Sequence, residues 1–271
     1  MRLLILLLTT LCLVPALSHT AMAQGISVSP TRLFFTGNPG ETVSQTVTFS
    51  NTSGQVLSFN NRIKDWRRDS VGTKIYFDDR NNSTSNAAWL SLTSKSIEIK
   101  PGEEKKIIVS INIPANASKL AHSMLFFTQT IPQQPSKQNG ISLGVRVLVE
   151  MGVQVYYAPA GLKTGDLEYL AFEDRGSFTE GQKTSRRLAL KIHNTGAINK
   201  DAFVRFELTN KETGEETKLE TKTLAMLPDA TQWVMLDLPA NLKGNYLVVA
   251  LLDAGSIYDL KVAEKEITYR P

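Results

Sequence analysis

Three histidines and one cysteine are the first candidates for chemistry in the 271-residue chain. Cys12 and His19 belong to an N-terminal segment that we expect to be removed, which leaves His122 and His193. These two are far apart in sequence, and neither has a carboxylate at the spacing of a metal-ligand pair. His193 precedes a turn-like Asn-Thr-Gly run and is expected at the surface. No metal, cofactor or cysteine nucleophile is therefore predicted.

The motifs of common hydrolases and phosphate-binding enzymes are missing from the sequence. It contains no Gly-x-Ser-x-Gly motif and no glycine-rich phosphate loop before a helix. The run Asp253–Ser256 offers one aspartate where aspartic proteases need two that share a proton, so it is interpreted as a strand entering an Asp/Gly turn. Carboxylates in polar segments are usually solvated, which is the expectation for Asp65, Asp69, Asp78 and Asp79. The protein is predicted not to be an enzyme.

The remaining polar cluster, Trp66-Arg67-Arg68-Asp69, has two interpretations. It could be a binding patch, but a strand end whose arginines face solvent is the expected one. The formal net charge is +4, and loss of Arg2 with the N-terminal segment gives +4 − 1, or about +3. So small and mixed a charge does not indicate nucleic-acid binding.

The N-terminus has the pattern of a secretory signal peptide. Arg2 is followed by an apolar run from Leu3 to Leu17, and then by Ala21-Met22-Ala23, a small-x-small cleavage signal. Residues 1–23 are therefore predicted to be removed, leaving 271 − 23 = 248 residues without cysteine. The apolar run is too short to span a bilayer, and no later segment is long enough, so no membrane insertion is expected after cleavage.

The mature sequence reads as short β-type segments separated by turn residues, which predicts an all-β fold of antiparallel sandwiches. Pro30, inside the first segment, indicates an edge strand or a switch point between sheets. Ala158-Pro159-Ala160-Gly161 indicates a boundary, giving predicted domains 24–159 and 160–271. Phe49–Gly54 and Ile192–Gly196 look alike, each an apolar strand end followed by Asn-Thr and Gly. Two sandwiches of the same kind would explain that similarity.

The longest alternating stretch is NGISLGVRVLVEMGVQVYYAP, residues 139–159. Ile141, Leu143, Val145, Val147 and Val149 alternate with other residues, as in a strand with one apolar face. That face could line the protein's own core, or it could be offered to another chain.

Four segments, in this order, resemble the periplasmic chaperones of chaperone–usher pilus assembly, the PapD-like family. Gly25–Leu33 matches the family's first strand, and Lys100–Glu103 matches its Pro-Gly turn before an alternating strand. Phe126–Pro132 matches the strand that ends in Ile-Pro, and Val153–Pro159 matches the end of the seventh strand. The resemblance covers roughly residues 25–159. It implies two immunoglobulin-like β-sandwich domains in tandem, and a periplasmic chaperone that caps pilus or surface subunits without nucleotide or metal.

The resemblance also implies which residues bind a subunit. The seventh strand would donate the row Leu143, Val145, Val147 and Val149 to the groove of a subunit that lacks a strand, with residues 132–140 as the loop that orders with it. Two cations would hold the subunit's C-terminal carboxylate. Arg32 matches the first, but Gln154 stands near the expected position of the lysine. An outer-membrane usher would be a further partner. The alternative is a structural or adhesive immunoglobulin-like module of the cell envelope.

Overall fold

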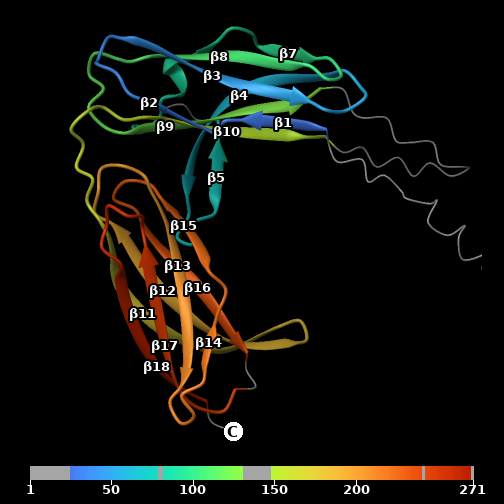
Figure 1. Cartoon of the computed structure of the whole chain (residues 1–271). Helices are drawn as coiled ribbons and strands as arrows, with labels where there is room; N and C mark the ends of the chain where they lie inside the picture. The colour runs from blue at the N-terminus through green and yellow to red at the C-terminus, as the bar shows by residue number, and fades with distance from the viewer. Residues whose placement is uncertain (1–24, 79–81, 131–147, 240–241, 270–271) are drawn as a thin grey trace, which may run out of the picture.

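The chain forms two immunoglobulin-like β-sandwiches, one after the other, as Figure 1 shows. The computed structural model describes residues 25–78, 82–130, 148–239 and 242–269. The upper sandwich contains β1 (Ile26–Ser29), β2 (Arg32–Phe35), β3 (Thr42–Asn51), β4 (Leu57–Arg68), β5 (Lys74–Phe77), β6 (Leu90–Leu92), β7 (Ser96–Ile99), β8 (Glu104–Asn112), β9 (Ala121–Gln129) and β10 (Glu150–Tyr157), with a 3₁₀ turn, η2, over Ala87–Trp89. Within these ranges, none of the helical structure is long and apolar enough to cross a bilayer.

The first sandwich is closed by two sheets over one apolar core. One sheet has the order β1-β3-β8-β6; the other has the order β2-β10-β9-β4-β5, with β7 also paired to β4. Alternate residues of facing strands fill the space between them, for example Val47, Val109, Phe127 and Val155, all at 0% exposure. This is the period-two pattern that the sequence predicts, since every second side chain of a strand points to the same face.

Pro30 lies where the first predicted strand changes sheets. β1 pairs antiparallel with β3 in one sheet, and β2 pairs parallel with β10 in the other. Proline fixes φ and has no N–H for a ladder, so it is tolerated between two edge segments and not within a central strand. The predicted switch point is confirmed, and it brings Arg32 beside the end of β10.

The second sandwich follows the residues of the expected linker. Its strands are β11 (Leu167–Glu180), β12 (Lys183–Asn194), β13 (Lys200–Asn210), β14 (Glu216–Lys218), β15 (Lys222–Met226), β16 (Thr231–Pro239), β17 (Gly244–Asp253) and β18 (Lys261–Tyr269). They form a sheet β11-β12-β16 and a sheet β14-β13-β17-β18, with β15 paired to β13. The exact domain limits at residues 23/24 and 159/160 stay predictions.

Two strands were not predicted from the sequence: β11 in the second sandwich and β5 in the first. β11 carries two register irregularities against β12 and leaves most of its residues partly exposed, so its alternation is interrupted. β5 has only four residues, and its pairing with β4 makes a hairpin that Figure 1 shows extending from the first sandwich toward β15. The turn of that hairpin contacts the second sandwich: the Trp233 N–H donates to the Ser70 carbonyl at 2.7 Å.

The similarity of Phe49–Gly54 and Ile192–Gly196 corresponds to a shared structure. Asn51 and Asn194 are both fully buried at strand ends. Asn51 donates from Nδ2 to the carbonyls of Gln55 and Ile99, at 2.8 and 3.0 Å, and accepts from the Ser53 N–H at 2.9 Å.

Asn194 repeats each of these bonds. It donates to the carbonyls of Ile198 and Leu227 at 2.8 and 2.9 Å and accepts from the Gly196 N–H at 3.0 Å. In each sandwich a single amide therefore ties the strand end to its own turn and to a distant segment. This explains why an asparagine occurs at both places.

Replacing either asparagine by alanine should destabilise its sandwich strongly. Asn51→Ala and Asn194→Ala each remove three hydrogen bonds that tie a buried strand end to its turn and to a distant segment, which should cost about 3 kcal/mol. Urea denaturation followed by circular dichroism measures the change. Asn116→Ala, at an exposed loop asparagine, is the control and should unfold like the wild type. Equal unfolding curves for all three variants would contradict the assignment.

Candidate functional site

The parallel register of β2 and β10 places Arg32 opposite Gln154. The two residues that the resemblance implies for the carboxylate site are therefore direct neighbours, and their role in binding stays a prediction. Arg32 also forms an ion pair with Asp201 at the start of β13, with about a third of its side chain exposed. The pair joins the first sandwich to the second. Because both groups remain partly in water, it contributes little to stability, and the arginine can exchange this carboxylate for another.

Gln154 is held in place by an aromatic neighbour. It is 8% exposed, and its Oε1 accepts a hydrogen bond from the Tyr156 hydroxyl at 2.8 Å. The Tyr156 ring stacks on Phe34, with 5.2 Å between centroids and 9° between planes. Burial raises the pKa of Tyr156 to about 12, against the opposing effect of nearby Arg32 and Arg68, so its hydroxyl stays a donor at neutral pH. Gln154 thus contributes a fixed polar group and no charge.

Two further cations come from the β4–β5 hairpin. Arg68 and Lys74 are cross-strand partners, and both lie over the buried Trp66 ring, at 5.4 and 5.7 Å from its centroid. Arg68 also donates to the Gly72 carbonyl at 2.6 Å. The expectation that the arginines of this cluster face solvent holds for the exposed Arg67 and is wrong for Arg68, because the aromatic ring and the hairpin turn hold its guanidinium.

Arg32, Arg68 and Lys74 act on one another electrostatically. Burial lowers the pKa of Lys74 first, and the positive charges of Arg68 and Arg32 lower it further. Burial likewise lowers the pKa of Arg68, and Asp201 opposes that shift. Three cations and one carboxylate, Asp201, therefore interact electrostatically, and the cluster has an excess of positive charge. Such a site favours an added anion, above all a carboxylate, which a guanidinium can bind through two hydrogen bonds.

The upstream half of β10 has an unpaired edge. Glu150–Val153 pair with β9 on one side, and pairing with β2 on the other side begins only at Gln154. Among the described strands, none covers the second side of Glu150–Val153. An uncovered edge presents free N–H and C=O groups, which is what an added strand requires.

The odd-numbered residues of β10 face the protein's own core. Val153, Val155 and Tyr157 are fully buried there, and Met151 packs against it. Val149 continues this row on the chain just before β10, and its carbonyl accepts from the Gln129 N–H at 2.9 Å. Leu143, Val145 and Val147, the rest of the expected donor row, lie outside the described residues, as does the whole of the 132–140 loop.

The two histidines differ in environment, and the described residues contain no group of three or more His, Cys, Asp or Glu able to hold a metal. His193 is partly exposed and lies 3.5 Å from the Asp229 carboxylate. His122 is 5% exposed, stacks edge-on against Trp66 and donates from Nε2 to the Trp66 carbonyl at 3.0 Å. Burial lowers the pKa of His122, with the Trp66 bond opposing the shift, so it is neutral in the folded protein.

No family model matches the sequence, and no curated protein matches it. Solved structures are similar to it in fold. The YadV chaperone is 14% identical with a TM-score of 0.47, over 90% of this chain and 100% of that one. The CsuC–CsuE chaperone–tip adhesion subunit pre-assembly complex from archaic chaperone–usher Csu pili of Acinetobacter baumannii is also similar. The matched chain is 13% identical with a TM-score of 0.48, over 88% of this chain and 97% of that one. The CupB2 chaperone of Pseudomonas aeruginosa is 14% identical with a TM-score of 0.44, over 88% of this chain and 99% of that one.

The burial of His122 makes stability depend on pH. With the pKa lowered in the folded state, the unfolded chain binds a proton that the folded chain does not, once the pH falls below the ordinary value of 6.5. The contribution of His122 to stability should therefore be constant above about pH 7 and should fall as the pH drops below about 6.5. His122→Gln should weaken this decline in urea titrations at several pH values, whereas His193→Gln should keep it. An unchanged decline in His122→Gln would contradict the prediction.

Proposed function

We propose that the protein is a periplasmic chaperone that caps secreted pilus or surface subunits by donating a β-strand to them. The observation that carries the proposal is the unpaired edge of β10 at Glu150–Val153, directly after an alternating apolar run. An open edge and an apolar row on one strand are the two elements of β-augmentation.

Each element would have a separate role in binding. The main-chain groups of the donated strand would bond a subunit strand without regard to its sequence. The groove left by the strand that the subunit lacks would be filled by Leu143, Val145, Val147 and Val149. The shape of these side chains would determine which subunits bind. While the complex lasts, the apolar groove of the subunit would be protected from aggregation. Exchange of one strand for another requires no nucleotide, metal or covalent step, so no enzymatic activity is proposed.

The cation cluster would hold the end of the subunit chain. A C-terminal carboxylate displacing Asp201 from Arg32 would also approach Arg68 and Lys74, whose charges replace that of the lysine expected at Gln154. Fixing the carboxylate would set the register of the added strand, because a shift by one residue turns every side chain to the opposite face.

The remaining parts of the proposal concern delivery. Removal of residues 1–23 would release the mature chain, beginning at Gln24, into the periplasm, with subunits and an outer-membrane usher as partners. The two domains would comprise residues 24–159 and 160–271.

Strand donation can be tested by co-purification with β-rich subunits encoded near this gene. Val147→Asp should reduce the recovered subunit at least tenfold, because a charge would enter an apolar groove. Leu148→Asp is the matched control. It adds the same charge at the neighbouring residue, whose side chain is 53% exposed and points to the opposite face of the strand from the donated row. Equal recovery with wild type and Val147→Asp would rule out donation through this row. If wild type recovers no subunit, the structural or adhesive module becomes the better explanation.

The anchor can be tested with a peptide of the co-purified subunit's C-terminal strand, prepared as the free acid and as the amide. The wild type should bind the acid about tenfold more tightly, since three cations face the carboxylate. Arg68→Gln combined with Lys74→Gln should remove most of that difference, and Arg32→Ala should do the same. Lys106→Gln, at an exposed residue of β8, should retain it. A full tenfold preference in the double variant would show that the hairpin cations are not part of the anchor.

A further inference from the structure

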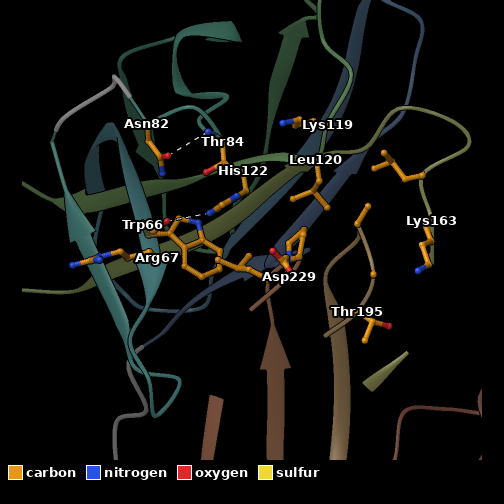
Figure 2. Close-up of a pocket in the computed structure, with 15 residues that line it drawn as sticks. Trp66, Arg67, Asn82, Thr84, Lys119, Leu120, His122, Lys163, Thr195 and Asp229 are labelled. Carbon is orange, nitrogen blue, oxygen red and sulfur yellow. Dashed lines mark hydrogen bonds between the residues drawn. The ribbon is translucent and has the colours of Figure 1, made fainter. Parts of the chain in front are cut away.

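A cavity of about 450 Å³, shown in Figure 2, lies between the two sandwiches, and no residue of β10 lines it. It is lined by Trp66, Arg67, Asn82, Thr84, Lys119, Leu120, His122 and, from residue 162 onward, by Leu162, Lys163, Thr195, Gly196, Ala197, Leu227, Pro228 and Asp229. Its size is in the range of small-molecule sites, and domain interfaces are where such sites are common. The proposed strand donation does not use this cavity, and the cation cluster borders it only through Trp66.

The wall formed by the second sandwich is fixed by hydrogen bonds. Asn194 donates to the Leu227 carbonyl, and the Asp229 N–H donates to the Gly196 carbonyl at 3.2 Å. Gly196 also lies so close to the chain that an added Cβ would be 1.9 Å from the Thr164 carbonyl oxygen. Asp229 itself has a φ of 54°, the left-handed region. These bonds leave the wall little freedom to collapse, so the cavity is preformed.

The opposite wall belongs to the first sandwich and is mainly apolar. Trp66 and Leu120 are part of a small core that also packs against Leu162 and Leu227. Figure 2 shows Trp66 and His122 on one side of the cavity and Lys163 on the other, with Arg67 extending away. A ligand in this cavity would therefore contact aromatic and aliphatic side chains for most of its surface.

The charged lining residues favour an anion. Lys119 and Lys163 are exposed at the cavity, whereas its one carboxylate, Asp229, already lies 3.5 Å from His193. Lysine ammonium groups at the rim of an apolar cavity complement a ligand with an apolar body and one negative group.

We propose that this interdomain cavity binds a small amphiphilic carboxylate, with its apolar part against Trp66, Leu120 and Leu227 and its carboxylate toward Lys119 and Lys163. The site shares no residue with the donated row, with Arg32 or with Gln154, and it borders the cation cluster only through the Trp66 ring, over which Arg68 and Lys74 lie. Its ligand contacts both sandwiches at once and thereby links them.

Isothermal titration calorimetry of the mature protein with decanoate, below its micelle concentration, tests the site. We expect one molecule bound per chain with a dissociation constant below about 1 mM. Decyltrimethylammonium, which has the same tail and the opposite charge, should bind at least tenfold more weakly. No saturable binding of decanoate up to about 5 mM, or equal binding of both amphiphiles, would overturn the proposal.

Two variants locate the binding. Ala197→Phe places a ring in the cavity and should weaken decanoate binding at least tenfold. Lys119→Gln combined with Lys163→Gln keeps the cavity open and should weaken it about fivefold, which decides the matter if Ala197→Phe fails to fold. Lys95→Gln combined with Lys106→Gln removes the same charge from exposed sites on the first sandwich and should leave the affinity unchanged. If both double variants lost decanoate affinity equally, the effect would come from the net charge of the protein, and the proposed site would be overturned.

Discussion

The parallel pairing of β2 with β10 is the contact on which the rest of the arrangement depends. It takes the first strand out of the sheet that holds β1 and fixes it to the far edge of the second sheet. Because that pairing begins at Gln154, it covers the end of β10, and no described strand covers the beginning. The same four residue pairs thus decide where the sandwich closes and where another chain could join it.

The second consequence of this pairing is electrostatic. Arg32 is brought to the end of the sandwich that faces β13, where it meets Asp201 and the hairpin cations. The buried Trp66 ring supports Arg68 and Lys74 from below, so two side chains with long flexible stems are held beside a third cation. Like charges held together repel one another, and an incoming carboxylate relieves that repulsion.

The sequence predicts the parts of this structure that depend on local rules. Alternation predicts the core strands, Pro30 predicts the change of sheet, and the Asn-Thr-Gly similarity corresponds to the matching roles of Asn51 and Asn194. It does not predict β5, because four partly exposed residues become a strand only through pairing with β4. Nor does it place Arg68, since the burial of Trp66 requires contacts with residues far along the chain, such as Leu162 and Leu227. Local patterns do not contain such distant contacts.

The β4–β5 hairpin gives the two sandwiches a support beyond the linker. Its turn bonds to Trp233, and an added Cβ at Gly72, whose φ is +89°, would lie 2.2 Å from the Gln232 side chain. Together with the packing around Trp66, this contact holds the two domains at one angle, to which the partly exposed Arg32–Asp201 pair adds little. A molecule whose angle is set before it meets a partner loses little rotational entropy on binding. More of the contact energy then remains as affinity, and partners that need a different angle are excluded.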